Sequence, residues 1–238
     1  MTGKKPTRPG AESRKAAVRV KTARKRSLSS TLWLERQLND PYVAEAGRLG
    51  YRSRAAFKLL QLDERFHLLR PGMRLVDLGA APGGWTQVAV ERIRPETTAG
   101  RVVGLDILEM APLPGAELLQ ADFLDEKAPE QLRAVLGGPA DLVLSDMAAP
   151  TTGHAATDHL RITALAETAY AFAAEVLSPG GAFVCKLFQG GAERDLLQRL
   201  KRDFAQVRHA KPPASRADSS ETYLVATGFR GGGADARE

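Results

Sequence analysis

The sequence has few of the residues that would build a disulfide-linked, zinc-binding or membrane-spanning protein. Its 238 residues include one cysteine, Cys185, which excludes an internal disulfide framework and a zinc site built from cysteines. No stretch approaches the roughly 18 uninterrupted apolar residues of a membrane span, and no apolar run of the secretory kind opens the sequence. The four histidines are scattered without ligand spacing, so we expect no metal site. These absences predict a soluble protein of a reducing compartment, the cytoplasm.

Acidic residues are scarce in the first part of the chain. Residues 1–70 carry 17 basic and 6 acidic side chains, whereas residues 71–238 carry 17 and 22. The first 30 residues hold ten basic residues, one acid and few large apolar side chains. Such a segment buries too little surface to offset its ordering entropy, so we predict a flexible basic arm over residues 1–30, and a frayed tail over 231–238. The arm favours a nucleic-acid partner, although a solubilising tail or a mitochondrial import signal would have a similar composition.

Between these ends, apolar runs and helix-length stretches alternate. Two helices are predicted first, over residues 31–38 and 53–66, with Ser53 as the candidate cap of the second. Short apolar runs bounded by Gly, Pro or Asp then predict strands over residues 74–78, 101–106, 117–121, 141–146, 182–187, 205–210 and 222–227. Stretches of helical length lie near residues 84–94, 125–136, 156–177 and 191–204. This alternation predicts an α/β fold, with a mostly parallel sheet, helices on both faces and an antiparallel strand at the end.

A glycine-rich turn follows the first predicted strand, in the segment Asp77-Leu78-Gly79-Ala80-Ala81-Pro82-Gly83-Gly84-Trp85. Glycines allow the backbone to approach a ligand closely, and open sheets bind nucleotides at the carboxyl ends of such strands. The segment is not the G-x-G-x-x-G of dinucleotide sites. It is not a P-loop either, because no Gly-Lys-Ser/Thr follows.

Two aspartates stand where the next two predicted strands end. Asp106 lies 22 residues beyond Gly84, at the position where an acid accepts the hydroxyl protons of an adenosine ribose. Asp122 follows the third strand, from which it could contact the adenine edge. Either aspartate alone would be better explained as a helix cap in a surface turn, but successive acids around one glycine-rich turn favour a binding site. An adenosine ligand without a phosphate cradle indicates S-adenosylmethionine.

An aspartate and a lysine end the fourth and fifth predicted strands. Asp146 closes the run at 141–146, and Lys186 lies inside the apolar run at 182–187. A lysine within an apolar strand is costly to bury unless it is paired or functional. The two residues therefore form either a structural ion pair or a site of proton transfer, and the sequence leaves both interpretations open.

These segments together resemble the RrmJ family of ribosomal RNA 2′-O-methyltransferases, also called FtsJ or RlmE. The resemblance covers roughly residues 30–230 and rests on residues 53–59, 77–85, 145–150, 186–190 and 215–225. It implies a Rossmann-like S-adenosylmethionine-dependent methyltransferase fold with a seven-stranded sheet, as one domain over residues 31–230. Its first part, residues 31–70, would be a helical extension facing RNA. The family's tetrad falls here on Lys58, Asp146, Lys186 and Glu221. By the same resemblance, the methyl donor would contact Gly83, Trp85, Asp106, Asp122 and Asp146.

The reaction implied by the resemblance is attack of a uridine 2′-oxygen of large-subunit (23S) ribosomal RNA on a sulfonium methyl group, in the assembled subunit. Lys186 is the candidate general base, and Lys58 is a neighbouring cation that would stabilise the developing oxyanion. Asp146 would orient the ammonium group and the donor. Glu221 would orient Lys58 or the ribose.

Other readings of the same residues remain open. The chain could instead be a 2′-O-methyltransferase of transfer RNA or another RNA, or an RNA-binding ribosome-assembly factor that uses the fold as a scaffold. Arg52 and Arg54 flank Lys58 and are candidates for phosphate contacts near the reacting ribose. Ribosomal RNA is the expected partner, and nothing in the sequence indicates an obligate protein partner.

Overall fold

The computed structural model describes residues 27–190 and 193–231, and the chain divides into two units, residues 1–44 and 45–238. The predicted basic arm lies outside the described residues as far as position 26, and the predicted tail lies outside them from position 232. In the first unit, α1 (Leu28–Leu38) begins three residues earlier than predicted. The reason is a cap: the Ser27 hydroxyl accepts the N–H of Ser30 at 3.2 Å.

The segment Asn39-Asp40-Pro41 ends α1 and also begins a helix that the sequence analysis did not predict. This helix, α2 (Pro41–Leu49), has proline at its first position, where the missing N–H costs no helical hydrogen bond. The Asp40 carboxylate accepts the N–H of Tyr42 at 3.0 Å, which caps the new helix. An aspartate followed by proline is therefore a start signal as well as a stop signal.

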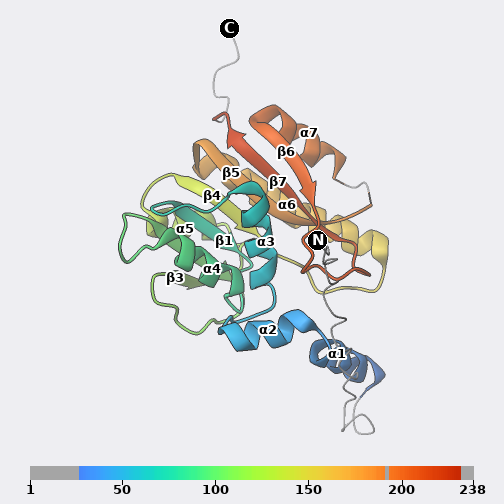
Figure 1. The fold of residues 1–238 in the computed structure, drawn as a ribbon. Helices are drawn as coiled ribbons and strands as arrows, with labels where there is room; N and C mark the ends of the chain where they lie inside the picture. The colour runs from blue at the N-terminus through green and yellow to red at the C-terminus, as the bar shows by residue number, and fades with distance from the viewer. Residues whose placement is uncertain (1–26, 191–192, 232–238) are drawn as a thin grey trace, which may run out of the picture. The chain divides into compact units, whose positions relative to one another are not determined.

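The second unit is built around one seven-stranded sheet with the strand order β3-β2-β1-β4-β5-β7-β6 (Figure 1). The strands are β1 (Arg74–Leu78), β2 (Arg101–Asp106), β3 (Glu117–Gln120), β4 (Ala140–Ser145), β5 (Leu177–Phe188), β6 (Phe204–Ala210) and β7 (Glu221–Phe229). β7 runs antiparallel to both of its neighbours, β5 and β6, and the remaining pairs are parallel. The predicted α/β fold, with its mostly parallel sheet and an antiparallel strand near the end of the chain, is confirmed.

Helices cover both faces of the sheet. α3 (Ala56–Phe66) and α4 (Gly84–Ile93) pack on one face, and α5 (Ala128–Leu136), α6 (Ala155–Val176) and α7 (Arg194–Asp203) pack on the other. Neighbouring strand residues alternate between the two cores, so that Leu75 belongs to one and Val76 to the other. Because helices cover both faces of the sheet, the central strands are buried on both sides and are nearly continuous apolar runs. β1 and β2 coincide with the runs predicted from sequence.

The helix that carries Lys58 begins later than predicted. α3 starts at Ala56, and Ser53 does not cap it: the Ser53 hydroxyl is buried without a hydrogen-bond partner in the described structure. Ala56, Leu59 and Leu62 form the buried stripe of α3. Lys58 is buried among them, with only 7% of its surface exposed. A lysine held in this position needs a polar partner inside the protein.

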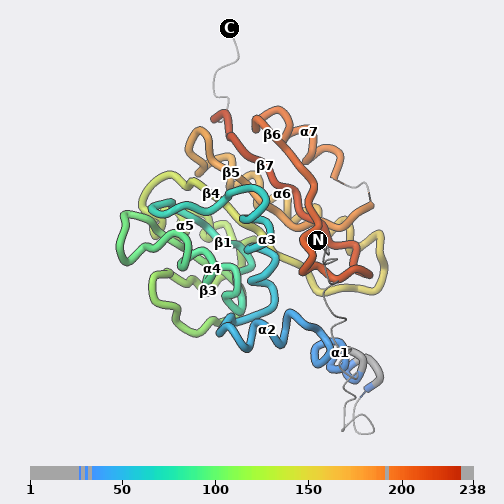
Figure 2. Tube along the Cα trace, viewed as in Figure 1, coloured from blue at the N-terminus to red at the C-terminus, as the bar shows by residue number. Residues whose placement is uncertain are grey.

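The parallel strands β1, β2, β4 and β5 end at one edge of the sheet, and the antiparallel strand β7 begins there. Figure 2 traces the chain through these strands. Leu78 of β1 is paired with Leu105 of β2 and with Ser145 of β4, and Ser145 is paired with Cys185 of β5. The residues that directly follow these four in the sequence therefore lie side by side where the strands end. In this way the register places the glycine-rich turn, Asp106, Asp146 and Lys186 along one edge of the sheet. In the described part of the chain, the helices are too short or too polar to cross a membrane.

Candidate active site

The glycine-rich turn touches the segment that follows β4. Gly79 has a φ of 76°, and a Cβ at this position would lie 2.8 Å from the Cα of Met147. A side chain of any kind would therefore force the two backbones apart, since real Cβ atoms do not approach other atoms so closely. Gly83, with a φ of 105°, is the N-cap of α4. The glycine-rich turn after β1 therefore packs directly against the segment that follows β4.

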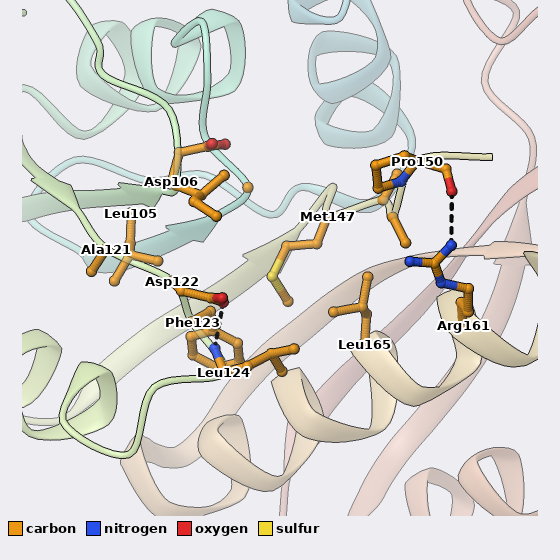
Figure 3. A pocket seen from close by; sticks show the side chains of 14 residues that line it. Leu105, Asp106, Ala121, Asp122, Phe123, Leu124, Met147, Pro150, Arg161 and Leu165 are labelled. Carbon is orange, nitrogen blue, oxygen red and sulfur yellow. Dashed lines mark hydrogen bonds between the residues drawn. The ribbon is translucent and has the colours of Figure 1, made fainter. Parts of the chain in front are cut away.

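A pocket of about 350 Å³ lies beside the contact between this turn and Met147. Its lining comes from the ends of β1 to β4 and from α6, and includes Gly79, Asp106, Asp122, Met147, Pro150 and Arg161. Asp106 and Asp122 lie on one side and Arg161 and Leu165 of α6 on the other, with Met147 between them (Figure 3). The volume falls in the range that small-molecule sites occupy, roughly 300–1,000 Å³.

The two predicted aspartates hold the loops that line this pocket. Asp106 accepts the N–H of Ala81 on one carboxylate oxygen and the N–H of Leu108 on the other, both at 2.9 Å. Asp122 accepts the N–H of Leu124, also at 2.9 Å. A carboxylate oxygen has two lone pairs, so these bonds leave both carboxylates able to accept further hydrogen bonds. Both residues therefore have a structural role in addition to the expected contact with a ligand.

Of the residues predicted to contact the donor, Gly83, Trp85 and Asp146 are not among those that line the pocket. The Trp85 indole is 3% exposed and packs in the core beneath α3, where its Nε1 donates to the carbonyl of Ala55 at 2.8 Å. Its ring lies 5.6 Å from that of Tyr223. A contact of Trp85 with a ligand would therefore have to use its backbone at the start of α4.

Lys186 and Asp146 form a close pair at the ends of β5 and β4. The Lys186 ammonium lies 3.0 Å from the Asp146 carboxylate and also donates to the Asp146 backbone carbonyl. Lys186 is only 8% exposed. The next residue after Asp146, Met147, lines the pocket, so the pair adjoins it.

Lys58 reaches the same place from α3. Its ammonium donates to the Glu221 carboxylate at 2.8 Å and to the Tyr223 hydroxyl at 3.1 Å. The second carboxylate oxygen of Glu221 accepts the hydroxyl of Ser215 at 2.7 Å. The four residues predicted as a tetrad therefore lie together, in two lysine–carboxylate pairs contributed by four different elements.

Tyr223 links the two pairs, and the sequence analysis gave it no role. Its hydroxyl donates to the Asp146 carboxylate at 2.8 Å while it accepts from Lys58. In the β5–β7 ladder Tyr223 is paired with Lys186, so the two side chains share a face. The signal was present in the alternation of β7: Tyr223 lies two residues after Glu221 and must point to the same side of the sheet.

Burial and the neighbouring charges shift the pKa values of Asp146 and Tyr223. Burial by itself would raise the pKa of Asp146, but the Lys186 and Lys58 cations and the Tyr223 hydrogen bond outweigh it and hold this pKa below its ordinary value. Burial raises the pKa of Tyr223 well above its usual value, and the Asp146 and Glu221 charges raise it further. The cluster therefore holds Asp146 as a carboxylate and Tyr223 as a neutral hydroxyl.

Asp77, inside β1, is a third buried acid near the site, and the sequence analysis did not select it. It has no exposed surface, and one carboxyl oxygen accepts the Thr86 hydroxyl at 2.7 Å while the other has no partner in the described structure. Burial raises its pKa from 3.8 to about 7, with smaller upward effects from Asp146 and Asp106. Among the described residues, no group of three or more His, Cys, Asp or Glu side chains is arranged to hold a metal ion.

Both the sequence and the fold are similar to those of known proteins. The chain is 69% identical over 226 residues to the Ribosomal RNA large subunit methyltransferase E of Paramagnetospirillum magneticum, covering 94% of this chain and 92% of that protein. It is 64% identical to the protein of the same name from Rhodospirillum rubrum, covering 94% and 86%. A crystal structure from Plasmodium falciparum, provisionally described as a ribosomal RNA methyltransferase, has 30% identity and a TM-score of 0.68, covering 76% of this chain and 100% of that chain.

A family match covers the site as a whole. The sequence pattern of the FtsJ-like methyltransferases matches residues 51–229, which include the glycine-rich turn, both lysines and both carboxylates of the cluster. Relatives also align with 94% of the chain. This chain therefore belongs to the FtsJ-like methyltransferase family.

Proposed function

We propose that the protein transfers a methyl group from S-adenosylmethionine to the 2′-hydroxyl of a uridine in 23S ribosomal RNA, in the assembled large subunit. The observation that supports this most directly is the cluster of Lys58, Asp146, Lys186 and Glu221 beside the pocket of about 350 Å³. The names of the relatives, which are ribosomal RNA large subunit methyltransferases, support the choice of RNA. Ribosomal subunits as substrate would place the reaction in the cytoplasm.

The pocket fits an adenosyl group without phosphates. Asp106 and Asp122 offer carboxylate oxygens at successive strand ends, which suits ribose hydroxyls and the adenine amino group. Gly79 lines the pocket as well, where it packs against Met147. When bound, S-adenosylmethionine supplies an electrophilic methyl group on a positively charged sulfur.

Each member of the cluster has a role in deprotonating and holding the acceptor hydroxyl. Lys186 is the proposed proton acceptor: its ammonium first releases a proton to solvent, and the neutral amine then takes the proton of the 2′-hydroxyl. Asp146 orients this amine through its carboxylate and its backbone carbonyl. Lys58 lies across the Tyr223 hydroxyl from Asp146 and supplies the cation that stabilises the developing oxyanion. Glu221 fixes Lys58 in place. Holding the two reactants in line contributes a further part of the acceleration.

Mapping of 2′-O-methyl groups tests the proposal. Ribosomal RNA from cells without the protein is expected to lack one 2′-O-methyl uridine in 23S RNA, and purified enzyme with labelled donor is expected to restore it on isolated large subunits. Lys186→Ala and Lys186→Met are expected to abolish methylation while they bind the donor, whereas Lys201→Ala, which removes an exposed lysine on α7, is expected to have no effect.

The alternatives give different results in the same assay. Preferential methylation of transfer RNA would identify another RNA as the substrate. Binding to subunits without any methyl transfer would identify an assembly factor. Normal turnover of Lys186→Ala would refute the assignment of Lys186 as the base.

A further inference from the structure

Arg52 lies between the segment that leads to Lys58 and the loops around the donor pocket. Its guanidinium donates to three backbone carbonyls: Pro112 at 2.6 Å, Ala111 at 2.8 Å and, more weakly, Pro82 at 3.5 Å. The first two belong to the loop between β2 and β3, and the third belongs to the glycine-rich turn. One side chain thus ties two loops of the donor site together.

The backbone of Arg52 is fixed to α4 by a second set of bonds. Its N–H donates to the Gln87 side chain at 3.0 Å, and the amide nitrogen of Gln87 donates to the carbonyl of Gly50 at 3.0 Å. The Arg52 side chain lies so close to Gly83 that a Cβ on this glycine would be 2.9 Å from the guanidinium. Backbone and side chain are therefore both held against the glycine-rich turn.

The geometry separates this arginine from one that binds phosphates. An arginine at a phosphate presents its planar fork of N–H groups to the anion. In Arg52 both terminal nitrogens are already directed at carbonyl oxygens of the protein. The loop held in this way begins at Ile107, which lines the pocket directly after Asp106.

We propose that Arg52 is a positioning residue for the methyl donor. It holds the loop from Ile107 to Pro112 against the glycine-rich turn, so that Asp106 and Ile107 keep their place at the pocket. The inference rests on the proposed function, because it takes the pocket to be the donor site.

Calorimetry of S-adenosylmethionine binding to the full chain tests this proposal without a methylation assay. Arg52→Gln and Arg52→Lys are both expected to weaken donor binding by about tenfold, since neither side chain reproduces a fork that reaches two loops. The turnover at saturating donor and the KM for large subunits are expected to stay within about twofold of wild type. Arg48→Gln is the matched control, because among the described residues Arg48 pairs only with Glu45, on the surface of the neighbouring helix α2.

A second measurement separates positioning from general destabilisation. Amide hydrogen exchange of Arg52→Lys is expected to accelerate about tenfold over residues 107–112 and to stay unchanged in the strands of the core. Exchange that is unchanged in this loop would overturn the proposal.

Three other results would also overturn it. Wild-type donor affinity in Arg52→Lys would mean that only the charge matters. A raised KM for subunits and a weaker salt dependence of RNA binding, with unchanged donor affinity, would identify a phosphate contact. If wild-type protein fails to bind the donor, the proposed function falls together with this inference.

Discussion

Replacing Asp77 by asparagine is expected to stabilise the protein increasingly as the pH rises from about 4 to about 7. The side chain has no exposed surface, and its pKa is raised from 3.8 to about 7, first by burial and then by the nearby carboxylates. The folded state therefore keeps a proton that the unfolded state releases near pH 4. As the pH rises from about 4 to about 7, this group lowers the free energy of unfolding, and above that range the decrease is complete.

The size of the effect follows from the pKa difference. One pKa unit corresponds to about 1.4 kcal/mol, so a shift from 3.8 to about 7 corresponds to roughly 4 kcal/mol at pH 8. Asparagine keeps an oxygen that accepts the Thr86 hydroxyl, and it has no charge to bury. The difference in stability between variant and wild type is therefore expected to grow from roughly 1–2 kcal/mol at pH 5 to roughly 4 kcal/mol at pH 8.

Urea unfolding of both proteins at pH 5, 6, 7 and 8 measures this difference directly. Other groups, such as Asp146 with its lowered pKa, change stability in the opposite direction in both proteins, and they affect the comparison only through their smaller coupling to Asp77. Asp218→Asn, at an exposed position, is the control and is expected to give a difference that does not vary with pH. A constant difference for Asp77→Asn as well would refute the reasoning.

Three further changes test other parts of the structure. Tyr223→Phe removes the hydroxyl that joins Lys58 to Asp146, and kcat is expected to fall on the order of ten- to a hundredfold, with donor affinity retained in calorimetry. Gly79→Ala places a Cβ 2.8 Å from Met147 at a positive φ, so a fall in the melting temperature and weaker donor binding are expected in thermal unfolding with and without donor. Removal of residues 1–26, which carry ten basic side chains, is expected to raise the KM for large subunits. It is also expected to flatten the log–log salt dependence of binding by about 0.9 for each RNA phosphate that these side chains neutralise.

Most of the fold could be predicted because the sheet is covered on both faces. The apolar runs of β1 and β2 match their strands residue for residue, since both faces of each strand are buried. The first half of β5 was missed, because the sequence Leu177-Ser178-Pro179-Gly180-Gly181 has the composition of a turn. α2 was missed because Asp40 and Pro41 were interpreted only as the end of a helix.

The candidate site was predicted less completely, for a different reason. Lys58, Asp146, Lys186 and Glu221 were selected by resemblance, and the structure brings all four together. Tyr223 was not selected, because its role depends on the ladder between β5 and β7, which joins segments about 37 residues apart in the sequence. Arg52 was a candidate for phosphate contacts because of its charge, and the sequence could not show that its guanidinium meets the carbonyls of Ala111 and Pro112.

The energetics of burial favour a functional interpretation of the Lys186–Asp146 pair over a purely structural one. Removing two charges from water costs about as much as their attraction returns, so a buried ion pair contributes little net stability compared with apolar residues of similar size. This chain buries two such pairs side by side, Lys186 with Asp146 and Lys58 with Glu221, in a unit whose two cores consist mainly of apolar side chains. An ion pair with a purely structural role would need no contact beyond the one between its two members. Here the Tyr223 hydroxyl orders both pairs relative to each other at the edge of a pocket, and that is an arrangement suited to holding and deprotonating an acceptor group.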